Sequence, residues 1–338
     1  MGARSSGKSG SVILPICTIV GNCIFEPVAN LHTNICLYQL MTGHLKIRSP
    51  RKQLGALLLC ASPLLITMFL NILFSNEEVK VDLSRPGAVE SLKWSQIITS
   101  VAFFFFPAFL FAVFTFRSKQ FYFLGFRKPE KPNMFILSGI CALVALPAMF
   151  WLGQINQELP VTEHLRQLEK TAGKTMETIL KVNSPMDVVI NLIVVALVPA
   201  FCEEIFFRGA VQRVLIHLTK NAWAGIIITG IFFSAMHFQF LGFLPRAALG
   251  IVLGVLYWYS GSLWTSIIAH FVINAVQVIA VSYMPKYVNE NPQMPVLSAV
   301  VSFIAVWVIL WYFKSKSTVT WSKVYDTEGL TPTNQFIA

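Results

Sequence analysis

Residues 186–207 read MDVVINLIVVALVPAFCEEIFF, an apolar run that ends with two adjacent glutamates. A run of about 20 apolar residues matches the length of helix that crosses the hydrocarbon core of a bilayer. It lacks the regular polar alternation of a half-buried strand. We therefore predict a transmembrane helix over Met186–Phe207, with Glu203 and Glu204 near its end.

Similar apolar runs recur along the chain, separated by short charged clusters. Of the 338 residues, 55% are hydrophobic and 12% are charged, and this charged fraction is roughly half that of an ordinary soluble domain. Such a chain cannot cover itself with a polar surface, so lipid is the expected solvent. We predict an all-α, polytopic membrane bundle of about eight transmembrane helices around a membrane-embedded polar cavity. The predicted spans are Leu54–Phe74, Ile97–Phe116, Met134–Gln154, Met186–Phe207, Ala222–Leu241, Pro245–Tyr259, Ser262–Tyr283 and Val296–Phe313. The sixth of these is short for a membrane span.

The net charge of +10 is concentrated next to the apolar spans, where Lys and Arg set the orientation of a membrane protein. Basic clusters precede the first span and follow the second, fourth and last. This alternation predicts a multi-pass protein with both termini on the cytoplasmic side. The expected partner of the spans is membrane lipid, and no nucleic acid is expected.

The chain divides into five segments by composition. Residues 1–52 form a basic lead, for which three readings stay open: a disordered segment, a signal-like segment at 12–25, or an over-called extension before a start at Met41. Residues 53–185 hold the first three spans, and residues 162–182 within them have the spacing of an amphipathic helix at the membrane surface or of a polar cap over the bundle. The other segments are the polar-residue-bearing core at 186–283, the last span at 284–314 and a polar tail at 315–338.

Ionisable side chains inside apolar spans are expensive, so each needs a reason. One such residue alone is often a satisfied structural contact, but several together indicate a functional site. The deep polar residues of this chain are Glu203, Glu204, Arg208, His237, His270 and Asn274.

The spacing of these residues predicts different roles for the two glutamates. Residues four apart share a helix face, so Glu204 lies over Arg208, and His270 over Asn274. Glu203 is rotated from Glu204 by about 100° around the helix. We predict that Arg208 keeps Glu204 ionised and structural, whereas Glu203 stays an unpaired carboxylate suited to act as a base.

Two of the polar residues are also predicted to lie at the same depth. If the fourth and fifth spans are antiparallel helices with a turn centred on Lys220, Glu203 and His237 are equally far from that turn along the chain. Antiparallel helices rise equally from a shared turn. A kink near Pro199 or Gly209 would shift this match.

A free carboxylate, two imidazoles and a carboxamide suit hydrolysis by an activated water. Glu203 would take the proton, His237 would orient the water, and His270 with Asn274 would donate to the oxyanion. Alternatively, Glu203, His237 and His270 form a three-ligand set for a divalent metal, zinc being the expected one. The residues alone leave both versions open. The sequence has no HExxH helix, no GxSxG elbow and no paired intramembrane aspartates, which disfavours other protease classes.

The run FCEEIFFRGAV at 201–211 resembles the EExxxR motif of the CAAX protease and bacteriocin-processing family. This family comprises intramembrane proteases and includes the type II CAAX prenyl endopeptidase. Phe233 with His237 resembles its second motif, and His270 with Asn274 its third. All three occur in the family's order and inside apolar spans, over residues from about 186 to 280.

The resemblance implies an intramembrane endopeptidase in which Glu203 activates water with His237 as its partner. It also implies that His270 and Asn274 bind metal or stabilise the oxyanion, and that Glu204 and Arg208 support the site. The substrate would be a peptide or protein, lipidated or not. Two other classes are kept: a non-catalytic scaffold or bacteriocin-immunity protein of the same fold, and a proton-coupled transporter, which the lack of internal repeats disfavours.

Overall fold

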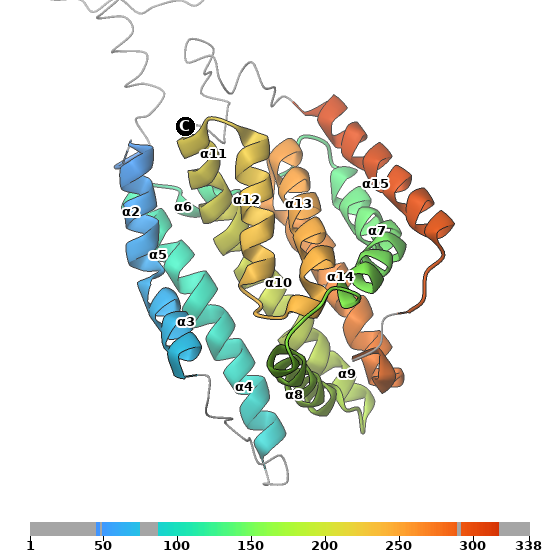
Figure 1. Cartoon of the computed structure of the whole chain (residues 1–338). Helices are drawn as coiled ribbons and strands as arrows, with labels where there is room; N and C mark the ends of the chain where they lie inside the picture. Colours follow the sequence, from blue (N-terminus) through green and yellow to red (C-terminus); the bar gives the residue numbers. More distant parts are fainter. Residues whose placement is uncertain (1–44, 48, 75–86, 289–291, 318–338) are drawn as a thin grey trace, which may run out of the picture. The chain divides into compact units, whose positions relative to one another are not determined.

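The computed structural model describes residues 45–47, 49–74, 87–288 and 292–317 (Figure 1). Within these ranges the chain is helical, and the only extended pairing is an isolated bridge between Leu45 and Phe116. The predicted all-α fold is therefore confirmed. The lead up to residue 44, with the 12–25 stretch and Met41, and the tail from residue 318 lie outside the described residues.

Six helices of the described part of the chain are long and apolar enough to cross a membrane. Their length and composition make the chain a multi-pass membrane protein. The other two predicted spans are present as shorter helices. The first is divided between α2 (Pro50–Cys60) and α3 (Ser62–Phe74), and the fifth is the 14-residue helix α12 (Ala222–Ala235). The six long helices are Ala88–Thr115, Met134–Gln157, Pro185–Thr219, Phe240–Ser260, Leu263–Tyr283 and Val296–Lys316.

The predicted end of the fifth span is wrong, and the error matters for the site. Helix α12 ends at Ala235 instead of Leu241, so His237 lies on a connection and not within the helix. Phe238 adopts a left-handed backbone conformation with φ of 53°, which a residue other than glycine rarely adopts. A short 3-10 turn, Phe240–Gly242, then leads into α13 (Phe243–Ser260), which is longer than the predicted sixth span.

Three π-helical segments interrupt the long spans. One joins α4 (Ala88–Ser100) to α5 (Phe106–Thr115), and the helix through the glutamates contains two more. Two of the three directly precede a helix with proline in its first turn, Pro107 or Pro199. A proline ring clashes with the carbonyl one turn earlier, and a wider turn relieves that clash. The fourth predicted span is thus built from α9 (Pro185–Asn191), a π segment (Leu192–Leu197), α10 (Val198–Glu204), a π segment (Ile205–Gln212) and α11 (Arg213–Thr219).

The turn between the fourth and fifth spans lies where it was predicted. Lys220 ends α11 in a left-handed conformation with φ of 53°. Asn221 then caps α12, because its side-chain oxygen accepts a hydrogen bond from the amide of Ala224 at 3.0 Å. Helices α11 and α12 contact each other as an antiparallel pair.

Glycines allow α12 and α13 to pack closely. A Cβ atom added to Gly250 of α13 would lie 2.8 Å from the Cα of Gly230 in α12, closer than packed atoms approach. Two glycine carbonyls of α13 then reach side chains of the fourth span. The carbonyl of Gly250 accepts from Arg208 at 2.9 Å, and that of Gly254 accepts from Gln212 at 3.0 Å.

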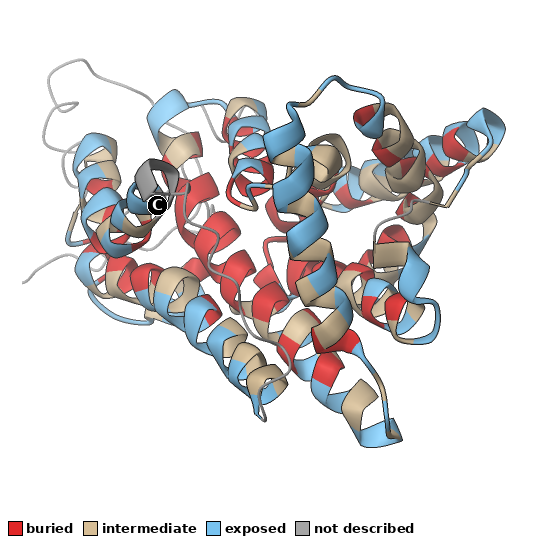
Figure 2. Cartoon of the chain, turned by 60° about the horizontal axis from the view of Figure 1, so that its bottom comes forward, coloured by how far each residue is buried: buried red, intermediate tan, exposed pale blue. Residues whose placement is uncertain are grey.

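The buried residues concentrate on the central helices, whereas the outer helices expose apolar faces (Figure 2). Helix α15 (Val296–Lys316) exposes Leu297, Val301, Ile304 and Trp311 at helical spacing. Side chains of this size on a water-facing surface would drive association, so such a face requires lipid or a partner. Helices α7 (Met134–Gln157) and α14 (Leu263–Tyr283) pack against α13 in the interior.

Helix α8 (Glu163–Leu180) is the amphipathic helix predicted at 162–182. Thr162 caps its start by accepting a hydrogen bond from the amide of Leu165. The helix contacts α4, α9 and α14, and Leu180 packs with Val278 and Val281 of α14. These contacts attach α8 to the rest of the bundle, and we call it the capping helix below; both readings, a helix at the membrane surface and a polar cap, stay predictions.

We predict that Gly250→Ala destabilises the bundle by about 1–3 kcal/mol, because the new methyl group meets backbone that cannot give way. The measurement is denaturant unfolding in detergent micelles. Gly139→Ala in α7 is the control, since its nearest neighbour would be 3.7 Å away and alanine favours a helix by about 1 kcal/mol. Equal stability of both variants would show that the α12–α13 contact is not close.

Candidate active site

A buried charged network joins three of the predicted site residues. Arg208 donates through Nη1 to Oε1 of Glu204 at 2.5 Å, and both side chains are 0% exposed. This is the pairing that the spacing predicts. His270 of α14 approaches the same carboxylate oxygen through Nδ1 at 2.9 Å, a contact that the sequence did not predict. Glu204 therefore holds both a guanidinium and an imidazole in place.

Glu203 lies beside this network but is not part of its hydrogen bonding. It is buried, and its Oε2 atom has no hydrogen-bond partner among the described residues. Its charge is close enough to interact with His270, Glu204 and Arg208. A buried carboxylate without hydrogen bonds is costly for stability. Of the two adjacent glutamates, Glu203 is therefore the one whose carboxylate stays available to a ligand.

Glu203 and His237 line the same pocket, of about 250 Å³. Met236 and Phe238 flank His237 in its wall, and the opposite wall comes from α3, α4 and the π segment after α4 (Leu64, Thr67, Thr99, Phe103). The shared depth predicted for Glu203 and His237 agrees with this common pocket. A single carboxylate and a single imidazole thus face the same small space.

The orientation of His237 follows from its hydrogen bond to backbone. Its Nδ1 atom lies 2.8 Å from the carbonyl oxygen of Phe233. A carbonyl can only accept, so Nδ1 carries the proton and Nε2 of the neutral ring has a free lone pair. His237 can therefore accept a hydrogen bond from a water, or bind a metal, through Nε2.

Phe233 contacts His237 of the pocket as well as His270 and Arg208 of the buried network. Its ring centroid lies 5.0 Å from that of His237 and 5.5 Å from that of His270. The guanidinium carbon of Arg208 lies 4.9 Å from the same centroid, in the geometry of a cation–π contact. One aromatic side chain therefore sets the spacing between the two histidines.

Asn274 is not brought to the pocket. It is half-buried on α14, one turn after His270, and its side chain makes no hydrogen bond within the described ranges. It is also not among the residues that line the pocket with Glu203. Its predicted role at an oxyanion stays a prediction.

The predicted metal ligands have suitable chemistry. In metal sites a histidine ligand commonly donates its other ring nitrogen to a carboxylate or carbonyl, and both His237 and His270 have Nδ1 in such a bond. Each keeps Nε2 for a ligand, and Glu203 has a free carboxylate. In the described part of the chain, however, no three His, Cys, Asp or Glu side chains are already gathered closely enough to hold a metal ion.

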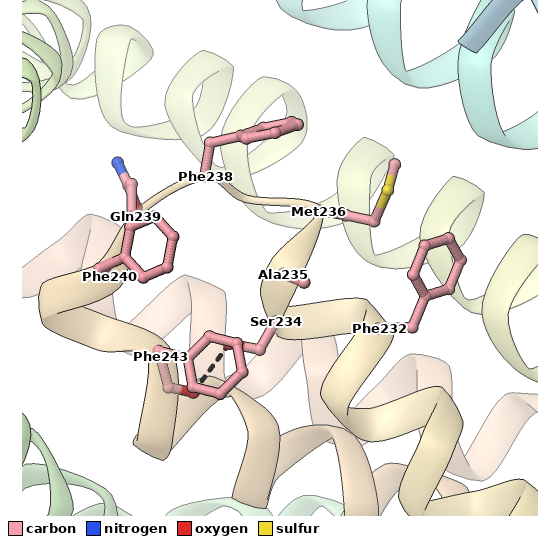
Figure 3. Close-up of a pocket in the computed structure, with 8 residues that line it drawn as sticks. All are labelled: Phe232, Ser234, Ala235, Met236, Phe238, Gln239, Phe240 and Phe243. Atoms are coloured by element: carbon pink, nitrogen blue, oxygen red, sulfur yellow. Dashed lines mark hydrogen bonds between the residues drawn. The ribbon is translucent and has the colours of Figure 1, made fainter. Parts of the chain in front are cut away.

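A second, apolar pocket of about 270 Å³ adjoins the first (Figure 3). It shares Met236 and Phe238 with the pocket of Glu203. Its other walls include Phe232, Phe240 and Phe243. The connection that bears His237 therefore lines both pockets.

Comparison with known proteins agrees with this site. Residues 185–276 match the family described as type II CAAX prenyl endopeptidase Rce1-like. The chain is 34% identical over 90 residues to a protein of Bacillus subtilis (strain 168) described as "Uncharacterized protein YpbD", a match that covers 25% of this chain and 43% of that protein. No solved structure matches. The resemblance expected from the three motifs is therefore confirmed over residues 185–276, which contain all three motifs and match the Rce1-like type II CAAX prenyl endopeptidase family.

Proposed function

We propose that this chain is an intramembrane endopeptidase in which Glu203 activates the water that attacks the peptide bond. The observation that supports this most is the contrast between the two adjacent glutamates. Glu204 is bonded to Arg208 and His270, whereas Glu203 is buried without a hydrogen bond in the pocket that it shares with His237. A scaffold has no use for such a carboxylate.

In the proposed reaction, Glu203 accepts a proton from water while the water oxygen attacks the carbonyl carbon. Glu203 then returns that proton to the leaving nitrogen as the C–N bond breaks. His237 accepts a hydrogen bond from the water through Nε2 and orients it. Asn274 donates its side-chain amide to the carbonyl oxygen if that side chain turns toward the pocket on substrate binding. His270 donates through Nδ1 to Glu204, so it can donate to the carbonyl oxygen only as a ring protonated on both nitrogens, whereas a neutral ring has Nε2 available to bind a metal.

A divalent metal, zinc being the expected one, is part of the proposal through the ligand set Glu203, His237 and His270. A metal bound there would polarise the water or the carbonyl. The two imidazoles are prepared for it by the hydrogen bonds at Nδ1. The roles of Phe233 and Glu204 in holding the rings are the same with or without metal.

The substrate of the proposed enzyme is a peptide or protein that reaches the site from the lipid. The apolar pocket next to His237 suits an apolar group carried by the peptide, lipidated or not. The exposed apolar faces of the outer helices agree with lipid as a partner. The proposed location is the bacterial cytoplasmic membrane, with both termini on the cytoplasmic side.

We predict that Glu203→Gln lowers kcat by about 10²–10⁴-fold, since the amide cannot act as a base, while unfolding in micelles stays unchanged or becomes harder. The assay is cleavage of peptides with CAAX termini, with and without a prenyl group, by purified protein. Glu163→Gln is the matched control, because Glu163 is exposed on α8. Full activity of Glu203→Gln would refute the proposed role, and no cleavage by the wild type of any peptide would favour the scaffold.

Arg208→Met is predicted to cost about 3–5 kcal/mol in the free energy of unfolding, because it leaves the buried Glu204 carboxylate without its cation. The double variant Glu204→Gln with Arg208→Met should be less destabilised than Arg208→Met alone, since no charge is then stranded. Chemical denaturation in micelles measures both. A cost below about 0.5 kcal/mol for Arg208→Met would mean that the pair is solvated.

We predict that the purified protein contains close to one divalent metal per chain and that His237→Ala loses it, because a remaining carboxylate and imidazole hold zinc weakly. Elemental analysis measures the content, and dialysis against a chelator followed by re-addition of zinc tests its use. Metal-free protein that keeps full activity after chelation would exclude the ligand role of the three residues and leave Glu203 to act directly on water.

A further inference from the structure

The His237-bearing connection lacks the support that a helix gives to its own side chains. His237 follows the end of α12, and the left-handed conformation of Phe238 turns the chain away from the helix axis. Irregular backbone at membrane depth persists only where its polar groups are satisfied by protein. The residues that bond to segment 236–244 therefore decide where His237 lies.

Two side chains, one on α12 and one on α13, bond to this segment. Ser234 donates through its hydroxyl to the carbonyl of Phe243 at 2.7 Å, which closes the connection at its base (Figure 3). Arg246 donates to both the side chain and the carbonyl of Gln239. These bonds fold the connection on itself, but they do not attach it to the rest of the bundle.

Attachment to the rest of the bundle comes from Asn156 in the last turn of α7. Its Nδ2 donates to the carbonyl of Phe240 at 2.6 Å, and its Oδ1 accepts from the amide of Leu244 at 2.5 Å. Leu244 lies in the first turn of α13, where amides have no partner within the helix. Asn156 is buried, and both polar atoms of its side-chain amide are hydrogen-bonded to this one segment.

Glu169 of the capping helix α8 provides the second attachment. Its carboxylate accepts from the amide of Leu241 at 2.7 Å, and its charge also interacts with Arg246. The partners of Asn156 and Glu169 are residues 240, 241 and 244, directly after His237. A helix that caps the bundle is thereby bonded to the wall of the pocket.

We infer, given the proposed peptidase function, that Asn156 and Glu169 are positioning residues that hold His237 against Glu203. Neither touches the pocket of Glu203, so neither is a catalytic residue. Both act through the connection, and their loss lets His237 move relative to the carboxylate. Because a displacement of about 1 Å can cost roughly 100-fold in rate, Asn156→Leu and Glu169→Ala should lower kcat by about 10- to 100-fold and change KM less.

The experiment combines these variants with His237→Ala. If Asn156 acts through His237, the variant with both Asn156→Leu and His237→Ala is as active as His237→Ala alone, since interacting positions are not additive. Glu169→Gln keeps an acceptor for Leu241 and should restore most of the activity lost in Glu169→Ala. Glu163→Ala, on the exposed face of α8, should retain wild-type activity. Effects that multiply in the double variant, or no rescue by Glu169→Gln, would overturn the inference.

A second measurement does not depend on activity. The rate at which diethyl pyrocarbonate modifies His237, followed by mass spectrometry, reports access to Nε2, and His164 on the exposed face of α8 is the internal reference. Asn156→Leu and Glu169→Ala should speed modification of His237 relative to His164. Unchanged rates in both folded variants would overturn the positioning role, whereas faster modification in a protein that cleaves no peptide would retain it and refute only the peptidase.

Discussion

The guanidinium of Arg208 is a charge with no exposed surface, so only its neighbours can stabilise it. Its two terminal nitrogens have hydrogen-bond partners, whereas Nε has none in the described part of the chain. The guanidinium donates hydrogen bonds to a carboxylate oxygen of Glu204 and to the backbone carbonyl of Gly250, and it lies over the ring of Phe233. These contacts belong to α10, α13 and α12, so one side chain fixes three helices relative to one another. The same carboxylate oxygen holds His270 of α14. Breaking this set would strand a charge inside the bundle, which is why the rest of the site can depend on it.

The network also separates the chemistry of two adjacent, otherwise identical side chains. Because Glu204 is hydrogen-bonded to Arg208 and His270, Glu203 is the carboxylate that remains available. Successive residues point in different directions around a helix, so Glu203 faces away from the partners of Glu204. It lines the pocket with His237. Phe233 packs against the rings of both histidines and so connects the pocket residue His237 to the network residue His270. In the proposed reaction, Glu203 can stay free because Glu204 is fixed by Arg208 and His270.

The sequence predicted the parts of this arrangement that depend on local spacing. The pairing of Glu204 with Arg208 follows from four-residue spacing, the turn at Lys220 from the positions of the spans, and the helical fold from the apolar runs. It did not predict the contact of His270 with Glu204, because 66 residues separate them and no local pattern encodes which helix faces which. It also missed the end of α12 at Ala235, since the connection is as aromatic as a span and contains no glycine or proline before Gly242. Asn156 and Glu169 were missed for a different reason. Asn156 lies at the end of α7 and Glu169 lies on α8, and polar residues are ordinary at both places.

The end of α12 at Ala235 determines how His237 is held in the site. On a helix, the direction of His237 would be set by the axis of α12, and its backbone amide and carbonyl would be used within the helix. On the connection, its ring is instead directed by a bond to the carbonyl of Phe233, and the backbone beyond it is held by Asn156 and Glu169. Irregular backbone in a membrane protein is costly unless its polar groups are paired, and these partners supply that pairing from two other helices. The buried ion pair can thus fix the carboxylate side of the pocket while α7 and α8 fix the imidazole side, and the pocket of about 250 Å³ that both sides line is where the proposed reaction would take place.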